Sequence, residues 1–128
     1  MVDEPKSPID VVRAFMAAMA KKDYETGLRY VSDHCEYDNV PISKQYGPAG
    51  VRGVLEPFFA PTLENEFVVL REVAEGPIVF QERLDRHRLA GGWVELPVTG
   101  VWEVHDGRIT VWHEYFDAAT LVKVWPAP

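Results

Sequence analysis

The chain has 128 residues, a formal net charge of -7 at pH 7, and 47% hydrophobic residues. This length fits a single domain, residues 1–128, with one core. The acidic balance disfavours nucleic acid and anionic membrane surfaces as partners, because both repel a negatively charged protein.

The cysteine count and the N-terminal sequence bear on the cellular location of the protein. Cys35 is the only cysteine, which excludes an intrachain disulfide and a metal centre built from thiolates. The N-terminus is acidic where a secretory signal is basic, and no apolar run reaches the length of a membrane span. We therefore expect a cytoplasmic protein without a membrane segment.

A first helix is predicted near the N-terminus. Ser7 offers a capping oxygen, Pro8 follows at the first helical position, and Asp10 adds an acid in the first turn. Behind this start, apolar residues recur at helical spacing as Ile9, Val12, Phe15, Met16 and Met19. The stripe ends near Lys21 and predicts one face packed against the core.

Two more helices are predicted before residue 60. Asp23 is suited to cap a second, shorter helix that extends to Val31. A third helix should begin after Gly47-Pro48, where apolar residues again recur at helical spacing. Pro57 is expected to bend or end this third helix, because proline lacks the backbone N–H that the helix needs.

From residue 63 onward the pattern changes to β-rich segments. The predicted strands are 63–75, 78–89, 93–104 and 108–116, divided by Gly76-Pro77, Gly91-Gly92 and Asp106-Gly107. Such short breaks predict antiparallel hairpins. With one earlier strand near 35–40, this order favours an α+β fold in which helices pack on one face of a curved sheet and leave a pocket.

Charged residues interrupt two of the predicted strands. Arg83 and Asp85 fall on one face of their strand, about 6.7 Å apart along it. In the last strand, alternation places Glu114 on the same face as Trp112 and Phe116. Because a lone carboxylate is costly to bury, we expect Arg83 to bridge the two carboxyl groups. Two carboxyls coupled in this way need not titrate alike, which provides an acid beside a base.

A second pair, Tyr37 and Asn39, shares one face of the early strand. A phenol hydroxyl and an amide are groups that hold a water molecule. An acid, a base and a positioned water are the parts needed to open an epoxide in one step without a covalent intermediate.

Three short motifs carry a resemblance to a known family. They are Tyr37-x-Asn39, Glu82-Arg83-x-Asp85, and the run Ile-Thr-x-Trp-x-Glu-Tyr-Phe-Asp over 109–117. Together they resemble the limonene-1,2-epoxide hydrolase family, within the nuclear transport factor 2-like (SnoaL-like) fold group. The resemblance implies a curved mixed sheet with helices on its concave face, a homodimer, and activity without a metal or an organic cofactor.

The resemblance also implies roles for the site residues. Asp85 would protonate the epoxide oxygen, Arg83 would bridge the carboxyls, and Glu114 would be the base. Tyr37 and Asn39 would help Glu114 hold the attacking water. The implied substrate is a small, mostly apolar epoxide. The residues implied to line its pocket are Trp112, Phe116, Leu96, Val98 and Leu121.

Two positions depart from the family pattern. The family usually has aspartate where this chain has Glu114, and the added carbon moves the carboxylate by about 1.5 Å. This shift counts against the family's terpene epoxide as the substrate. His87 stands where the family tends to be apolar, which makes it a candidate substrate-binding residue for a more polar or differently shaped epoxide.

Other interpretations of the same residues remain open. An arginine and an aspartate two apart on a strand are often an ion pair on a solvated face. Asp117 is better placed to cap a final helix than to act as an acid, and His34, His105 and His113 show no metal-ligand spacing. The pocket is also compatible with a proton-shuttling isomerase or cyclase, or with a non-catalytic module that binds a small ligand.

Overall fold

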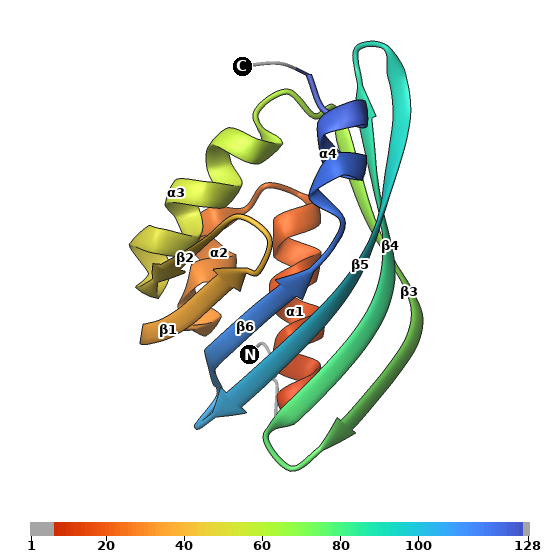
Figure 1. Cartoon of the computed structure of the whole chain (residues 1–128). Helices are drawn as coiled ribbons and strands as arrows, with labels where there is room; N and C mark the ends of the chain where they lie inside the picture. The colour runs from red at the N-terminus through yellow and green to blue at the C-terminus, as the bar shows by residue number, and fades with distance from the viewer. Residues whose placement is uncertain (1–6, 127–128) are drawn as a thin grey trace.

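The computed structural model describes residues 7–126, and its helices lie on one side of a six-stranded sheet (Figure 1). The helices are α1 Pro8–Ala20, α2 Tyr24–Gly27, the 3-10 helix η1 Leu28–Tyr30, α3 Gly47–Phe59 and α4 Ala118–Val124. The strands are β1 Val31–Asn39, β2 Ser43–Tyr46, β3 Glu64–Glu75, β4 Ile78–Leu89, β5 Gly92–His105 and β6 Arg108–Tyr115. None of the helices within 7–126 is long and apolar enough to cross a membrane.

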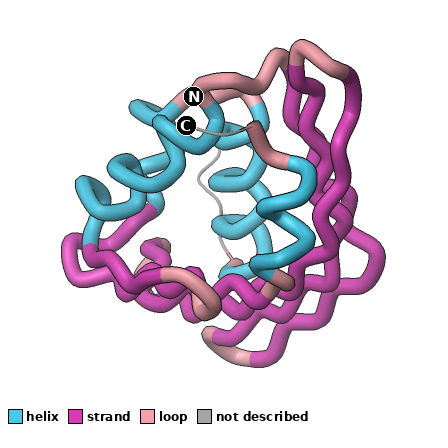
Figure 2. Tube along the Cα trace, turned by 45° about the horizontal axis from the view of Figure 1, so that its top comes forward, coloured by secondary structure: helices cyan, strands magenta, loops and turns pink. Residues whose placement is uncertain are grey.

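The sheet is mixed and strongly bent. Its order is β2-β1-β6-β5-β4-β3, in which β1 and β6 run parallel and the other neighbours run antiparallel. The ladder shifts register between Val69 and Arg71 and between Glu103 and Val104, and such bulges bend strands. Figure 2 shows the strands curving around the helices, so the predicted α+β fold with helices inside a curved sheet is confirmed.

The three predicted breaks join the four long strands as antiparallel hairpins. Asp106 and Gly107 both have positive φ, 52° and 75°, as a two-residue hairpin turn requires. At the start of the chain, Ser7 caps α1 as expected, because its Oγ accepts from the Asp10 amide at 3.2 Å.

Several element boundaries differ from the sequence prediction. The second helix is wrong at its end, because Val31 is buried as the first residue of β1 instead. The helix α3 continues past Pro57 to Phe59, whose ring is buried in the core. The strand β2 was not predicted, since all four of its residues are exposed and show no apolar alternation.

A stack of aromatic rings supports the centre of the sheet. Tyr37 of β1 stacks on Trp112 of β6 at 4.2 Å between ring centroids, and Trp112 stacks on Trp102 of β5 at 4.5 Å. Phe15 of α1 meets both indoles edge-on, at 5.2 and 5.9 Å. These contacts fix the three central strands against α1 and give the neighbouring polar side chains a rigid support.

Candidate active site

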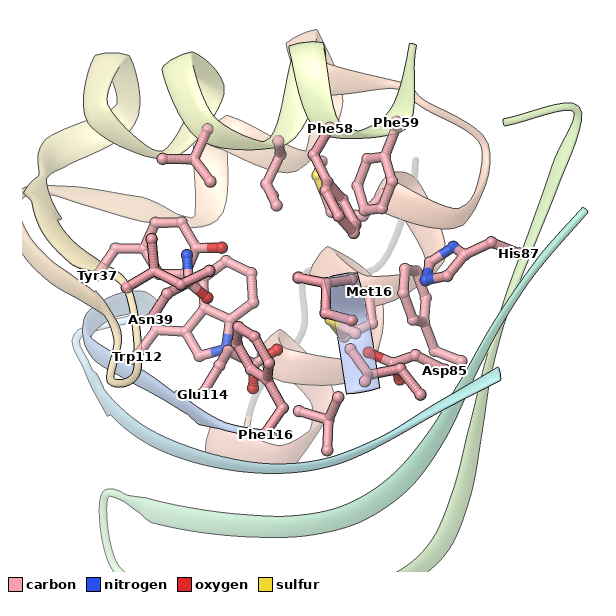
Figure 3. Close-up of a pocket in the computed structure, with 18 of the residues that line it drawn as sticks. Met16, Tyr37, Asn39, Phe58, Phe59, Asp85, His87, Trp112, Glu114 and Phe116 are labelled. Carbon is pink, nitrogen blue, oxygen red and sulfur yellow. The ribbon is translucent and has the colours of Figure 1, made fainter. Parts of the chain in front are cut away.

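A pocket of about 130 Å³ lies between α1, α3 and the inner face of the sheet (Figure 3). Its wall is mainly apolar, and the phenyl rings of Phe58, Phe59 and Phe67 belong to it although they were not predicted as site residues. Every predicted site residue except Arg83 lines this pocket, namely Tyr37, Asn39, Asp85, His87, Leu96, Val98, Trp112, Glu114, Phe116 and Leu121.

Arg83 lies behind the pocket wall, with its side chain 0% exposed. Nε and Nη2 donate to the two oxygens of Asp85 at 2.9 and 3.0 Å. Nη2 and Nη1 donate to the two oxygens of Glu114 at 2.6 and 3.3 Å, and Nη1 also donates to Gln81 Oε1 at 3.2 Å. All the N–H donors of the guanidinium are therefore used, and one cation holds both carboxyl groups.

A chain of polar groups behind Arg83 was missed by the sequence analysis. Gln81 Oε1 accepts from Arg83 and from Trp102 Nε1 at 3.1 Å, while Gln81 Nε2 donates to Glu72 at 2.6 Å. Arg13 of α1 in turn donates to Glu72 at 2.6 Å. The signal for Gln81 was present, because it lies two residues before Arg83 and therefore on the same strand face.

Gly100 is the second residue that the sequence analysis missed. It lies in β5 directly opposite Glu114 of β6. A Cβ atom at this position would be 2.6 Å from both Arg83 Nη1 and Glu114 Oε2. The ion bridge therefore requires glycine here, and a lone glycine inside a strand is the sequence signal for such a close approach.

Burial shifts the protonation of two groups beside the bridge. Burial raises the pKa of Glu114, Arg83 opposes this change, and the charge of Asp85 adds to it. Burial and the charge of Glu114 raise the pKa of Tyr37. Glu114 is consequently a stronger base than an exposed glutamate, and the Tyr37 phenol keeps its proton at neutral pH.

The parallel pairing of β1 and β6 brings Tyr37 and Asn39 to the bridge. In this register Tyr37 lies opposite Trp112, and Asn39 lies opposite Glu114. Figure 3 shows these four side chains on one side of the pocket and Asp85 on the other. Trp112 Nε1 is buried beside the Glu114 carboxylate, and its N–H opposes the rise in the Glu114 pKa that burial causes.

His87 forms a separate polar cluster in the same wall. His87 is 2% exposed, and its Nδ1 lies 2.7 Å from Asn65 Oδ1. Burial lowers the pKa of His87 to about 4, although the charge of Asp85 opposes this change. The imidazole is therefore neutral at pH 7.

Other candidate residues have structural roles. Asp117 caps α4, because its Oδ2 accepts from the amide and the hydroxyl of Thr120 at 3.2 and 2.6 Å, so the predicted cap is confirmed. His113 contacts Glu36 at 2.7 Å, outside the pocket. Across the described range 7–126, no three His, Cys, Asp or Glu side chains gather as a metal ion would need.

Comparison with known proteins identifies relatives with this fold and sequence. Residues 6–127 match the family model of the limonene-1,2-epoxide hydrolase catalytic domain. The epoxide hydrolase EphG of Mycobacterium tuberculosis (strain ATCC 25618 / H37Rv) is 33% identical over 112 residues, which are 88% of this chain and 74% of that relative.

Solved structures extend the likeness to the fold. A structure of an M. tuberculosis LEH-like epoxide hydrolase matches with a TM-score of 0.78 and 33% identity, over 91% of this chain and 86% of that one. An NTF2-like protein of unknown function from Burkholderia pseudomallei K96243 shares the fold, with a TM-score of 0.80 at 16% identity over 94% of this chain and 98% of that one. From the family match and the EphG identity together, this chain belongs to the limonene-1,2-epoxide hydrolase family.

Proposed function

We propose that this protein is an epoxide hydrolase of the limonene-1,2-epoxide hydrolase type, which adds water to a small, mostly apolar epoxide in one step. The observation that carries the proposal is the bridge in which Arg83 binds both oxygens of Asp85 and both oxygens of Glu114 at the pocket wall. The apolar lining suits the carbon skeleton of such a substrate. The relative named epoxide hydrolase EphG supports the same reaction.

In the proposed step, Glu114 takes a proton from a water molecule that Tyr37 and Asn39 help to hold. The water oxygen attacks one carbon of the oxirane, and the bond from that carbon to the ring oxygen breaks. Asp85 gives its proton to the ring oxygen as the charge develops there. One C–O bond forms and one breaks, so the product is a vicinal diol and no redox partner is needed.

The bridge also serves the return of the enzyme to its starting state. After turnover the proton is on Glu114, and it has to return to Asp85 before the next water molecule is activated. Both carboxyls are bound to one guanidinium, which keeps the positive charge between them in either state. One proton shared by the pair leaves the whole cluster without net charge.

The test is a single turnover of a panel of small epoxides in ¹⁸O-labelled water, followed by mass spectrometry of the diol. We expect one labelled hydroxyl in the first turnover, because water attacks directly. Asp85→Asn should lower kcat by about 10³-fold, as expected for the loss of a general acid, while the fold is retained. An unlabelled diol would contradict direct attack, and an unaffected rate would remove Asp85 as the acid.

Glu66→Gln is a matched control for the acid assignment. Glu66 lies on β3 and pairs with Arg86 at 2.9 Å, with its side chain 40% exposed. Its replacement should leave the rate unchanged. Solvent deuterium exchanged into a ketone or enone, without any diol from the epoxide panel, would instead identify an isomerase.

A further inference from the structure

His87 belongs to a polar cluster to which the proposed reaction assigns no task. It lies two residues from Asp85 on the pocket face of β4 and directly opposite Asn65 of β3. Thr62, Asn65 and His87 are 3%, 6% and 2% exposed, so the cluster is shielded from bulk water. A buried polar cluster beside a binding pocket is a candidate for substrate recognition.

A chain of hydrogen bonds fixes which ring nitrogen of His87 carries the proton. Thr62 Oγ1 donates its only proton to the carbonyl oxygen of Phe59 at 2.7 Å, so it acts as an acceptor toward Asn65. Asn65 Nδ2 donates to Thr62 Oγ1 at 2.9 Å, which leaves Asn65 Oδ1 facing His87 Nδ1. Because an amide oxygen only accepts, Nδ1 carries the proton and Nε2 is a bare acceptor.

Aromatic rings surround the His87 imidazole. The rings of Phe58, Phe59, Phe67 and Trp125 lie 4.9 to 6.2 Å from the His87 ring, measured between centroids. No side chain within 7–126 donates a hydrogen bond to Nε2. Nε2 is not one of the fully buried atoms that lack a partner, so a molecule in the pocket can reach it and pair a donor with it. Since the ring is neutral at pH 7, the matching group is a neutral donor such as a hydroxyl.

We propose that His87 Nε2 accepts a hydrogen bond from a hydroxyl group of the substrate, so that the preferred substrates are epoxides bearing a hydroxyl group. This inference rests on the proposed epoxide hydrolase function. Asp85 and His87 are two residues apart on one strand face, about 6.7 Å. The hydroxyl therefore lies several bonds from the oxirane, and the skeleton between them contacts the apolar wall.

The test compares pairs of epoxides with the same carbon skeleton at several spacer lengths, one with a distal hydroxyl and one with a methoxy group in its place. The methoxy compound keeps the oxygen but lacks the donor. We expect wild-type kcat/KM to favour the hydroxyl compound by about tenfold at the best length, the effect of one hydrogen bond to a buried neutral acceptor.

Two substitutions at His87 locate the source of this preference. His87→Leu should abolish it, because leucine has no acceptor. His87→Gln keeps an acceptor oxygen and should retain part of the preference, and it guards against a leucine variant that fails to fold. Val54→Ala is the matched control, because Val54 lines the same pocket without a polar side-chain atom, and its hydroxyl-to-methoxy ratio should equal that of the wild type.

The outcomes separate this inference from the proposed function. Equal kcat/KM for the two compounds at every length, or a preference that survives in His87→Leu, overturns the inference and leaves the hydrolase intact. Absence of diol from both compounds overturns the hydrolase instead. If no diol forms, calorimetry of the same pairs tests the hydrogen bond to His87. A Kd about tenfold lower for the hydroxyl compound supports this bond, and equal Kd values overturn it.

Discussion

The pocket face of β4 carries two polar clusters that are adjacent in sequence and opposite in character. The cluster around Arg83 is ionic, and its guanidinium is shared by Asp85 and Glu114. The cluster around His87 is neutral, and its ring is held by Asn65. Both are buried, yet the first depends on charge balance and the second on matching each donor to an acceptor.

In the proposed function, the ionic cluster performs the chemistry and the neutral cluster selects the substrate. The ionic cluster joins β4 to β6 across β5, because the carboxyls of Asp85 and Glu114 bind the same guanidinium. The neutral cluster has one acceptor to spare and no partner for it within 7–126. Substitutions in the ionic cluster and in the neutral cluster should therefore have different effects on stability and activity.

The largest expected effect comes from removing the shared cation. Arg83→Met leaves two carboxyl groups buried without a counter-ion, which should lower the free energy of unfolding by about 3–5 kcal/mol at pH 7 and abolish turnover. The loss should shrink as the pH falls, because protonation removes the unpaired charges. Urea unfolding at several pH values measures both effects.

Arg86→Met is the matched control for the cation. Arg86 lies on the other face of β4 and pairs with Glu66 and Glu95, both at 2.9 Å, near solvent. Exposed pairs of this kind contribute about 0–1 kcal/mol. If the two methionine variants are equally stable, burial of the ion bridge is not the reason that Arg83 matters.

The second effect concerns the neutral cluster around His87, which loses stability when the ring gains a proton. The pKa of His87 is lowered to about 4 in the folded protein, against 6.5 for an ordinary histidine. Its contribution is full above pH 6.5 and is lost as the pH falls toward 4, because the unfolded chain binds the proton first. The loss should reach about 3 kcal/mol over this window.

His87→Gln isolates this contribution, because glutamine does not titrate. The unfolding free energy of the wild type minus that of the variant should fall by about 3 kcal/mol as the pH falls from 6.5 to 4, whereas the slopes from the carboxyl groups are common to both. Parallel curves over this range would mean that His87 is protonated equally well in the folded chain.

The sequence predicted the residues of the ionic cluster better than the residues that surround and hold them. Alternation along β4 and β6 was enough to place Arg83, Asp85 and Glu114 on the inner face, because a strand has only two faces. Gln81 and Gly100 each had a signal in their own strand, but their partners Glu72, Trp102 and Glu114 lie on other strands, whose register the sequence pattern does not fix. The tautomer of His87 was also beyond reach, since it depends on Thr62 and Asn65, far away in the chain.

The smallest expected effect comes from adding a methyl group at Gly100, where the side chains of Arg83 and Glu114 leave little space. Gly100→Ala places a methyl group 2.6 Å from both Arg83 Nη1 and Glu114 Oε2, and such overpacking should cost about 1–3 kcal/mol. Gly53→Ala is the control, because a Cβ there meets nothing within 4 Å and helix formation improves, so stability should rise by about 0.5–1 kcal/mol.

The glycine and the long carboxylate should be coupled, because each occupies the space that the other leaves. Glu114→Asp shortens the side chain opposite Gly100, which removes one of the two close contacts of the new methyl group and leaves the contact with Arg83. In a double-mutant cycle, Gly100→Ala should therefore cost about 1 kcal/mol less in the Glu114→Asp background than in wild type. If the free-energy effects of the two substitutions are strictly additive, the methyl group clashes with Arg83 alone. The length of the Glu114 side chain would then be a response to the substrate rather than to the space at Gly100.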